Sequence, residues 1–142
     1  MRLNRLLFLL IGAALAAGLL VSVFVRPEPS LTASEDCYGL CPSVTALSLL
    51  SSTVTYGDEH AEKFSVKVTA RAPGTGVPTG HVVVESGGKF LCNTYLYLGM
   101  GSCSPAAEAL ARGSYKIVAY YSGDKNFKPS RSRMEPLIVI RH

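Results

Sequence analysis

The stretch Gly113-Ser-Tyr-Lys-Ile-Val-Ala-Tyr-Tyr-Ser-Gly-Asp-Lys-Asn-Phe127 decides the fold of this chain. Its first part alternates apolar residues with others, which is the two-residue period of a β-strand that buries one face. The residues expected on the buried side are Tyr115, Ile117, Ala119 and Tyr121. In the second part, a glycine tolerates positive φ and a carboxylate can accept hydrogen bonds from nearby amides. We expect Gly123 and Asp124 to hold a structural turn and Phe127 to plug the end of a β core.

Similar short runs fill the rest of the chain from residue 43 onward. Glycine, proline and small polar residues separate them, at Tyr56-Gly57-Asp58, at residues 72–79 and at Ser86-Gly87-Gly88. The expected strands cover residues 44–50, 62–70, 80–85, 90–98, 101–105, 113–121 and 134–140, with a brief helical turn or a loop at 106–112 and a loop at 122–133. No helical period occurs in this region, so the pattern predicts an all-β, antiparallel two-sheet sandwich of about seven strands over residues 43–142.

The first 26 residues differ from the rest. The run Leu6–Val25 holds twenty residues without a charge, and at about 1.5 Å per residue a helix of that length spans about 30 Å of hydrocarbon. Arg2 and Arg5 precede the run, which favours a cytoplasmic N-terminus. We therefore expect residues 1–26 to be a signal anchor that contacts the lipid bilayer through residues 6–25, with the C-terminal domain outside the cytoplasm.

A cleaved signal peptide is the alternative. Small residues suited to cleavage occur at Ala14-Leu15-Ala16 and at Thr32-Ala33-Ser34. Residues 27–42 form an expected extended linker, because Pro27 and Pro29 cannot lie inside a helix. Both alternatives place the domain outside the cytoplasm, tethered in one case and secreted in the other.

The four cysteines agree with an exported chain. An even number in a small exported domain indicates disulfides, and four cysteines allow three connectivities. Cys92 and Cys103 flank the Gly99-Met-Gly101 turn, so a hairpin there would bring them together. Cys37 and Cys41 could close a short loop or attach the linker to the domain.

The net charge of +4 does not indicate nucleic-acid binding. Three of the fourteen Lys and Arg residues flank the apolar run, which leaves eleven against ten Asp and Glu, or about +1. Basic residues gather toward the C-terminus without interleaved aromatic residues, so we expect no nucleic-acid partner.

Four segments together resemble the bacterial immunoglobulin-like domains of group 3, over about residues 44–140. They are Thr53-Val-Thr-Tyr-Gly57, Phe64-Ser-Val-Lys-Val-Thr-Ala70, Pro78-Thr-Gly80, and Gly113–Asp124 followed by Asn126-Phe127. The resemblance implies an immunoglobulin-like sandwich with a structural or binding role and no catalytic residues. This chain holds one such domain rather than a tandem array, and residues 101–113 depart from the family pattern.

No catalytic, cofactor or metal site is expected. The acidic residues around His60, namely Asp58, Glu59 and Glu62, lie in a turn where charged side chains are ordinary. Tyr95 and Tyr97 would be a binding candidate if exposed. We expect a non-enzymatic surface module that binds or spaces an envelope protein or cell-wall polymer. The alternatives are a secreted binding protein and an accessory subunit of a membrane complex.

Overall fold

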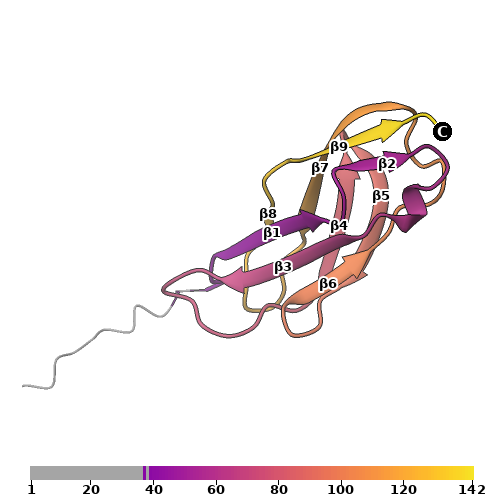
Figure 1. Cartoon of the computed structure of the whole chain (residues 1–142). Coiled ribbons are helices and arrows are strands. Elements are labelled where there is room, and N and C mark those ends of the chain that lie inside the picture. Colours follow the sequence, from indigo (N-terminus) through magenta and orange to yellow (C-terminus); the bar gives the residue numbers. More distant parts are fainter. Residues whose placement is uncertain (1–36, 38) are drawn as a thin grey trace, which may run out of the picture. The chain divides into compact units, whose positions relative to one another are not determined.

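The protein is described from a computed structural model, which covers residue 37 and residues 39–142. The predicted anchor and most of the predicted linker lie outside these residues, so the domain boundaries at 26 and 42 stay predictions. Within the described part, nine strands and a 3₁₀ turn, η1 (Glu59–Ala61), follow one another (Figure 1). The strands are β1 (Ser43–Leu49), β2 (Thr53–Thr55), β3 (Phe64–Ala70), β4 (His81–Ser86), β5 (Lys89–Tyr95), β6 (Met100–Cys103), β7 (Gly113–Tyr121), β8 (Ser130–Arg131) and β9 (Glu135–Ile140).

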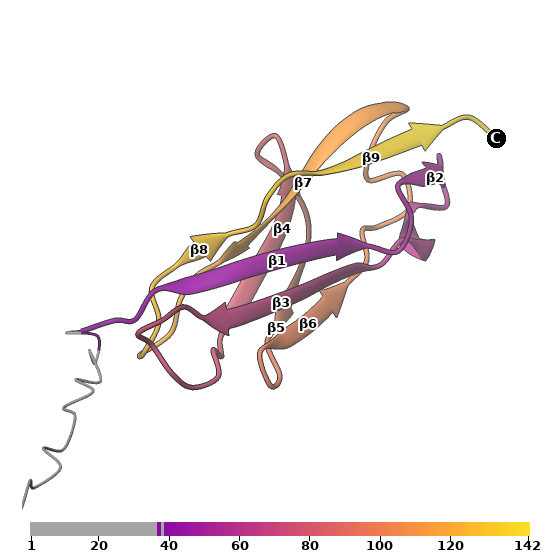
Figure 2. The ribbon, with the colours of Figure 1, turned by 60° about the vertical axis from the view of Figure 1, so that its left-hand side comes forward.

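The strands form two packed sheets (Figure 2). One sheet has the order β1-β3-β6, and the other has the order β2-β9-β7-β4-β5 with β8 paired to β7. The all-β sandwich predicted from the alternating runs is therefore confirmed. No helix among residue 37 and residues 39–142 has the length and apolar character needed to cross a membrane.

The core lies between the two sheets because each strand buries alternate residues. In β3, Phe64, Val66 and Val68 are buried while the residues between them are exposed. They face the core residues of the larger sheet, which are Val82, Val84, Leu91, Cys92, Ile117, Ala119, Tyr121, Leu137 and Val139. Burial of one such aliphatic side chain stabilises the fold by about 1.5–3 kcal/mol, so this core contributes most of the free energy that holds the two sheets together.

The sequence analysis did not predict two short strands, β2 and β8. β2 pairs with β9 in parallel, with Thr53 opposite Ile138, so the expectation of purely antiparallel sheets is wrong at this edge. β8 lies inside the segment expected to be a loop, where Arg131 pairs with Tyr120. Runs of three and two residues are too short to show the alternation on which a strand prediction depends.

The turn after β5 forms, but the two strands that it connects, β5 and β6, belong to different sheets. Tyr97 and Met100 exchange backbone hydrogen bonds of 2.7 and 3.0 Å around Leu98 and Gly99. β5 then belongs to the large sheet, whereas β6 pairs with β3 in the small sheet. The expected hairpin of neighbouring strands is therefore wrong, since β5 and β6 are edge strands of different sheets.

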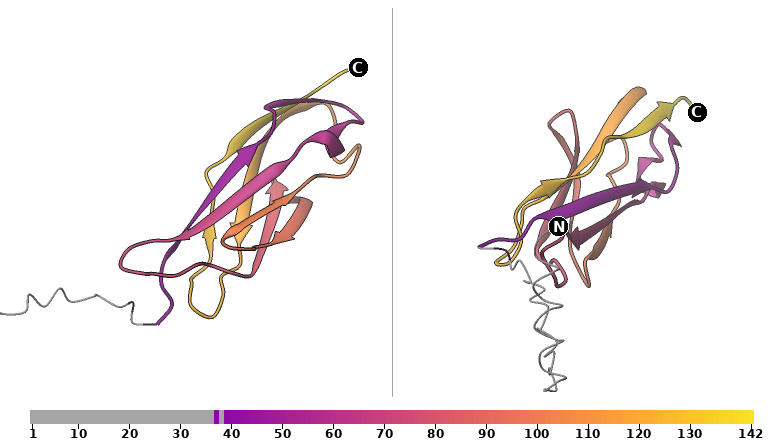
Figure 3. Two further views of the ribbon diagram at one scale, coloured as in Figure 1. Left: turned by 60° about the horizontal axis from the view of Figure 1, so that its bottom comes forward. Right: turned by 90° about the vertical axis from the view of Figure 1, so that its left-hand side faces the viewer.

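The two ends of the described domain are far apart along its length. β1 begins at one end of the sandwich, and the C-terminus lies at the other (Figure 3). The residues before β1, the loops 71–80 and 122–129, and the turn after β5 gather on the side where β1 begins (Figures 2 and 3).

Candidate functional site

The turn predicted around Asp124 is a dense hydrogen-bond centre. Its Oδ1 accepts bonds from the backbone amides of Asn126 and Phe127, at 2.7 and 2.8 Å. Its Oδ2 accepts bonds from the amide and the hydroxyl of Thr79, at 2.8 and 2.9 Å. Gly123 has φ of +83°, and a Cβ there would lie 2.7 Å from the carbonyl oxygen of Phe127. The carboxylate therefore holds the loop after β7 and also ties it to the loop before β4.

These bonds set the electrostatics of the turn. Burial opposes ionisation of the Asp124 carboxyl, but bonds donated by Thr79, Asn126 and Phe127 outweigh it and lower its pKa to about 2. The neighbouring Tyr121 side chain is buried, and its hydroxyl has no hydrogen-bond partner among the described residues. Burial, and then the charge of Asp124, raise the pKa of Tyr121 far above its usual range.

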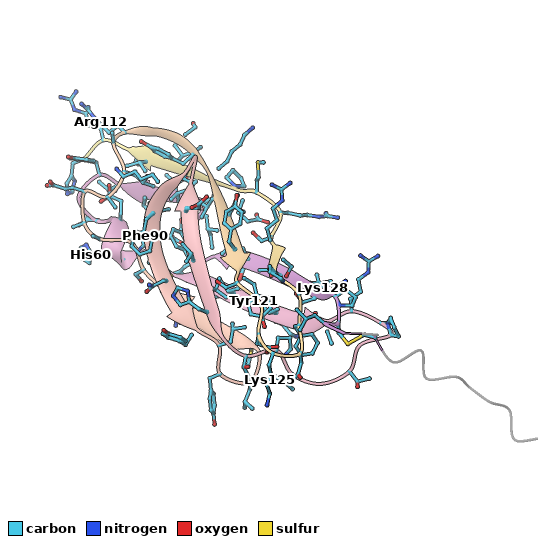
Figure 4. The ribbon with its side chains drawn as sticks, turned by 180° about the vertical axis from the view of Figure 1, so that it is seen from behind. His60, Phe90, Arg112, Tyr121, Lys125 and Lys128 are labelled. Atoms are coloured by element: carbon cyan, nitrogen blue, oxygen red, sulfur yellow. A yellow bond between two sulfur atoms is a disulfide. The ribbon has the colours of Figure 1, made fainter. Side chains whose placement is uncertain are left out.

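The segment before β1 attaches to this turn. The amide of Cys41 donates to the carbonyl of Asn126, and the amide of Lys128 donates to the carbonyl of Cys41, both at 2.8 Å. Phe127, between them, is 1% exposed and belongs to the core cluster. Figure 4 shows Tyr121, Lys125 and Lys128 toward the end of the sandwich where the chain joins the domain.

Both disulfides are present. Cys37 pairs with Cys41, four positions apart, so this bridge closes a short loop on itself. Cys92 pairs with Cys103, eleven positions apart. Because Cys92 lies in β5 and Cys103 in β6, this bridge joins the two sheets along one open side of the sandwich.

Hydroxyl groups join the sheets along the opposite side. The Ser130 side chain on β8 hydrogen-bonds to the side chains of Ser43 and Thr45 on β1, at 2.7 Å each. Ser43 also donates to the carbonyl of Lys128 at 2.8 Å. One side of the sandwich is therefore closed by a covalent bond and the other by a hydroxyl cluster.

Two buried glutamates were missed by the sequence interpretation. Glu59 is fully buried, and its Oε2 accepts bonds from the amides of Gly57 and Glu108, at 2.9 Å each. Its Oε1 is buried without a partner among the described residues. Glu62 is 2% exposed and accepts bonds from the amide of Ser51. The local sequence does not indicate that these two glutamates are buried acceptors, because acidic residues in a turn are usually exposed.

The acidic turn does not assemble a cluster of ligands. Asp58 and His60 are exposed, whereas Glu59 and Glu62 are used by backbone amides. Across residue 37 and residues 39–142, no group of three His, Cys, Asp or Glu side chains is placed to hold a metal ion.

A shallow groove of about 630 Å³ lies on the outer face of the small sheet. Register places Ser48, Ser65 and Ser102 in one row across its floor. Lys63 and Lys67 are the charged residues that line it, and the exposed Tyr97 and Met100 form one wall. This groove combines hydroxyl, cationic and aromatic groups with no carboxylate among its lining residues.

Two packed sheets with a parallel edge strand, a disulfide between sheets and a Tyr-Ser-Gly-Asp turn define an immunoglobulin-like β-sandwich. The chain belongs to the family of bacterial Ig-like domains of group 3, whose pattern matches residues 47–139. The resemblance read from the sequence is therefore confirmed. No curated protein matches the chain.

A solved structure of fibronectin(III)-like modules from Clostridium thermocellum CbhA is distantly similar. It shares 13% identity over 69% of this chain and 96% of that one, with a TM-score of 0.44. That likeness is too distant to support an inference about function. Immunoglobulin-like domains are typically non-catalytic, and function must be argued from the surfaces of this domain.

Proposed function

We propose that this protein is an exported, membrane-tethered immunoglobulin-like module that binds or spaces components of a bacterial envelope without catalysis. The observation that carries the proposal is one disulfide-linked Ig-like domain behind a twenty-residue uncharged run. Disulfides persist in oxidising compartments and are rare in the cytosol, which favours an extracytoplasmic domain. The length of Leu6–Val25 suits a single span of the bilayer.

A binding or spacing role agrees with how the described side chains are used. The carboxylates of the buried Glu59 and Glu62 and of the partly exposed Asp124 accept bonds from backbone amides, so they serve the fold rather than chemistry. The groove beside Tyr97 supplies a surface on which an envelope protein or a cell-wall polymer can bind. We expect no nucleic-acid partner, because the basic residues toward the C-terminus are not interleaved with aromatic residues.

The location can be tested in cells of a bacterial host that express the full chain. We expect the protein in the membrane fraction, resistant to alkaline extraction, with its domain digested by protease added to spheroplasts and its cysteines blocked from alkylation until reduced. Replacing Leu15 by Arg places a charge in the middle of the run at a cost of about 2.5–3.5 kcal/mol and should release the domain from the membrane. A wild-type protein found in the cytosol with four free thiols would overturn the proposal.

A secreted form is the second candidate, because Ala14-Leu15-Ala16 and Thr32-Ala33-Ser34 supply small residues at possible cleavage sites. The intact mass of the mature protein separates the two forms. A mass equal to the full chain supports the tether, and loss of the N-terminal segment supports secretion.

A further inference from the structure

Four segments share one side of the domain, which we call the loop face. They are Cys37 to Pro42 without the undescribed residue 38, residues 71–80, residues 96–99 and residues 122–129. Thr79 bonds to Asp124, and a Cβ on Gly76 would lie 3.8 Å from Phe127. A Cβ on Gly99 would lie 3.5 Å from Cγ1 of Val77. Figures 2 and 3 show these loops on the side where the chain joins β1.

The loop face exposes large apolar side chains at the tips of its loops. The exposed fractions are 40% for Leu40, 55% for Val77, 79% for Tyr97 and 66% for Leu98. Contiguous exposed apolar groups mark contact with a protein or a membrane.

The backbone at Leu98 strengthens this observation. Leu98 and Gly99 have φ of +51° and +76°, as in a type I′ turn, where Asn or Gly is preferred at the first of these positions. A leucine with positive φ is strained, and here it gains no burial in return. An apolar side chain held outward at such a position fits an apolar contact outside the domain.

The charge of the loop face favours an anionic partner. Arg71, Lys125 and Lys128 are exposed on it. Asp124 is the sole carboxylate in the four segments as described, and its two oxygens already accept four hydrogen bonds. The four segments thus carry a formal charge of +2, and Glu35 and Asp36, which precede Cys37 in the sequence, carry an equal and opposite charge.

We propose that the loop face docks on the surface of an anionic bilayer, with Leu98 and Val77 inserted at the headgroup level and the three cations beside lipid phosphates. This inference rests on the proposed tether. Eleven residues, 26–36, separate the uncharged run from Cys37, and at up to about 3.5 Å each they keep the loop face within about 40 Å of the membrane. Tyrosine, leucine and cationic residues are the groups that interfacial anchors use. A bilayer is favoured over a protein partner because apolar tips and cations share the side to which the tether leads.

A single tryptophan reports the docking, because the natural chain contains none. The full chain carrying Leu98→Trp or Val77→Trp is reconstituted into vesicles of phosphatidylcholine with phosphatidylglycerol. Phe90→Trp is the matched control, since Phe90 is 58% exposed and lies away from Lys125 and Lys128 (Figure 4). Lipids brominated near the headgroup quench tryptophans that reach the interface.

We expect blue-shifted emission and at least about twofold quenching at positions 98 and 77, with no quenching at position 90. Replacing Arg71, Lys125 and Lys128 by Gln, using phosphatidylcholine alone, or raising the salt should reduce the quenching about twofold. In a Val77→Trp background, Leu98→Asn should also reduce it, although Asn suits the turn better.

Each other outcome contradicts the docking. Vesicles that carry the protein but leave positions 98 and 77 unquenched would overturn the loop-face inference and leave the tether intact. Equal quenching at positions 98 and 90 would show contact without a preferred face. Protein that does not float with the vesicles would overturn the tether and the docking together. Crosslinking of position 98 to a second copy without quenching would assign the face to self-association.

Discussion

Thr79 donates two hydrogen bonds to one oxygen of Asp124, from its amide and from its hydroxyl, although the residues lie 45 positions apart. The other oxygen of Asp124 bonds within its own turn, so a single carboxylate joins the loop before β4 to the loop after β7. Charge-assisted bonds of this kind are about twice as strong as neutral ones.

Replacement of Asp124 by Ala should lower the free energy of unfolding by about 2 kcal/mol, because three amides and a hydroxyl lose their charged acceptor at once. Denaturant unfolding followed by tyrosine fluorescence measures the loss. Asp58→Ala is the matched control, since the Asp58 side chain is 56% exposed and only 3.8 Å from an even more exposed His142. The control should change stability by less than about 0.5 kcal/mol, and equal effects of the two variants would contradict the role of Asp124.

The same carboxylate predicts a loss of stability in acid. Its folded pKa is lowered to about 2, below the value of about 3.9 expected in the unfolded chain, so ionised Asp124 stabilises the fold at any pH above about 4. As the pH falls from about 4 to about 2, about 1–2 kcal/mol should be lost, after allowance for solvent screening of this partly exposed group. The free energy of unfolding of Asp124→Asn, measured against pH, should lack this loss between about pH 4 and 2. If the variant lost as much stability in acid as the natural protein, Asp124 would not be the group responsible.

The two disulfides should differ in their effect. Replacing Cys92 and Cys103 by Ala opens a loop of about twelve residues and should lower the free energy of unfolding by about 3 kcal/mol on the chain-entropy account. Replacing Cys37 and Cys41 opens a much shorter loop, for which the same account gives about 2 kcal/mol or less. Thermal unfolding of the two double variants makes the comparison, and a larger loss for the Cys37–Cys41 pair would contradict it.

Removal of the buried Glu59 side chain should be costly. Glu59→Ala leaves the amides of Gly57 and Glu108 without their acceptor and creates a cavity, so we expect a loss of about 2–4 kcal/mol. Glu59→Gln keeps one oxygen for both amides and should lose less than the Ala variant. Equal losses would contradict this expectation and would show that the ionised carboxylate itself is required, because Gln keeps the side-chain volume and one acceptor oxygen.

Leu98→Asn should stabilise the protein in the absence of membranes by about 1 kcal/mol, because Asn tolerates positive φ better than Leu. Leu98 is 66% exposed, so little packing is lost with it. Urea unfolding of the full chain in detergent micelles, with Leu98→Ala beside it, separates the backbone effect from the loss of the side chain. A destabilised Leu98→Asn variant would indicate that Leu98 packs within the domain.

The sequence predicted those elements in which a long alternating run meets a buried face. The alternation of Phe64, Val66 and Val68 appears in the structure as a strand with one buried side, and Ile117 and Tyr121 are buried on one side of β7, which also buries Val118 on the other. It could not assign β5 and β6 to different sheets, because a tight turn at Leu98 and Gly99 is equally compatible with a hairpin inside one sheet. The partners of an edge strand depend on packing far away in the sequence, and periodicity does not report them.

The candidate surfaces were harder to predict than the fold. Asp124 was singled out because a turn after a strand needs a glycine and an acceptor, whereas its link to Thr79 depends on a loop far along the chain. Glu59 and Glu62 have ordinary local surroundings, and their burial follows from how the turn folds onto Gly57, Ser51 and Glu108. The strain at Leu98 comes from its positive φ, which cannot be predicted from the residue type alone.

The sheets are joined along one side of the sandwich by a disulfide and along the other by hydrogen bonds. The two sides therefore differ in how easily the sheets can separate. If a force pulls the two sheets apart, the disulfide between Cys92 and Cys103 keeps β5 joined to β6 unless it is reduced. The hydroxyl contacts of Ser130 with Ser43 and Thr45 can separate and re-form. Under mechanical load we therefore expect the sheets to separate first on the β1–β8 side, where only hydrogen bonds and core packing join them, while the disulfide keeps β5 and β6 together.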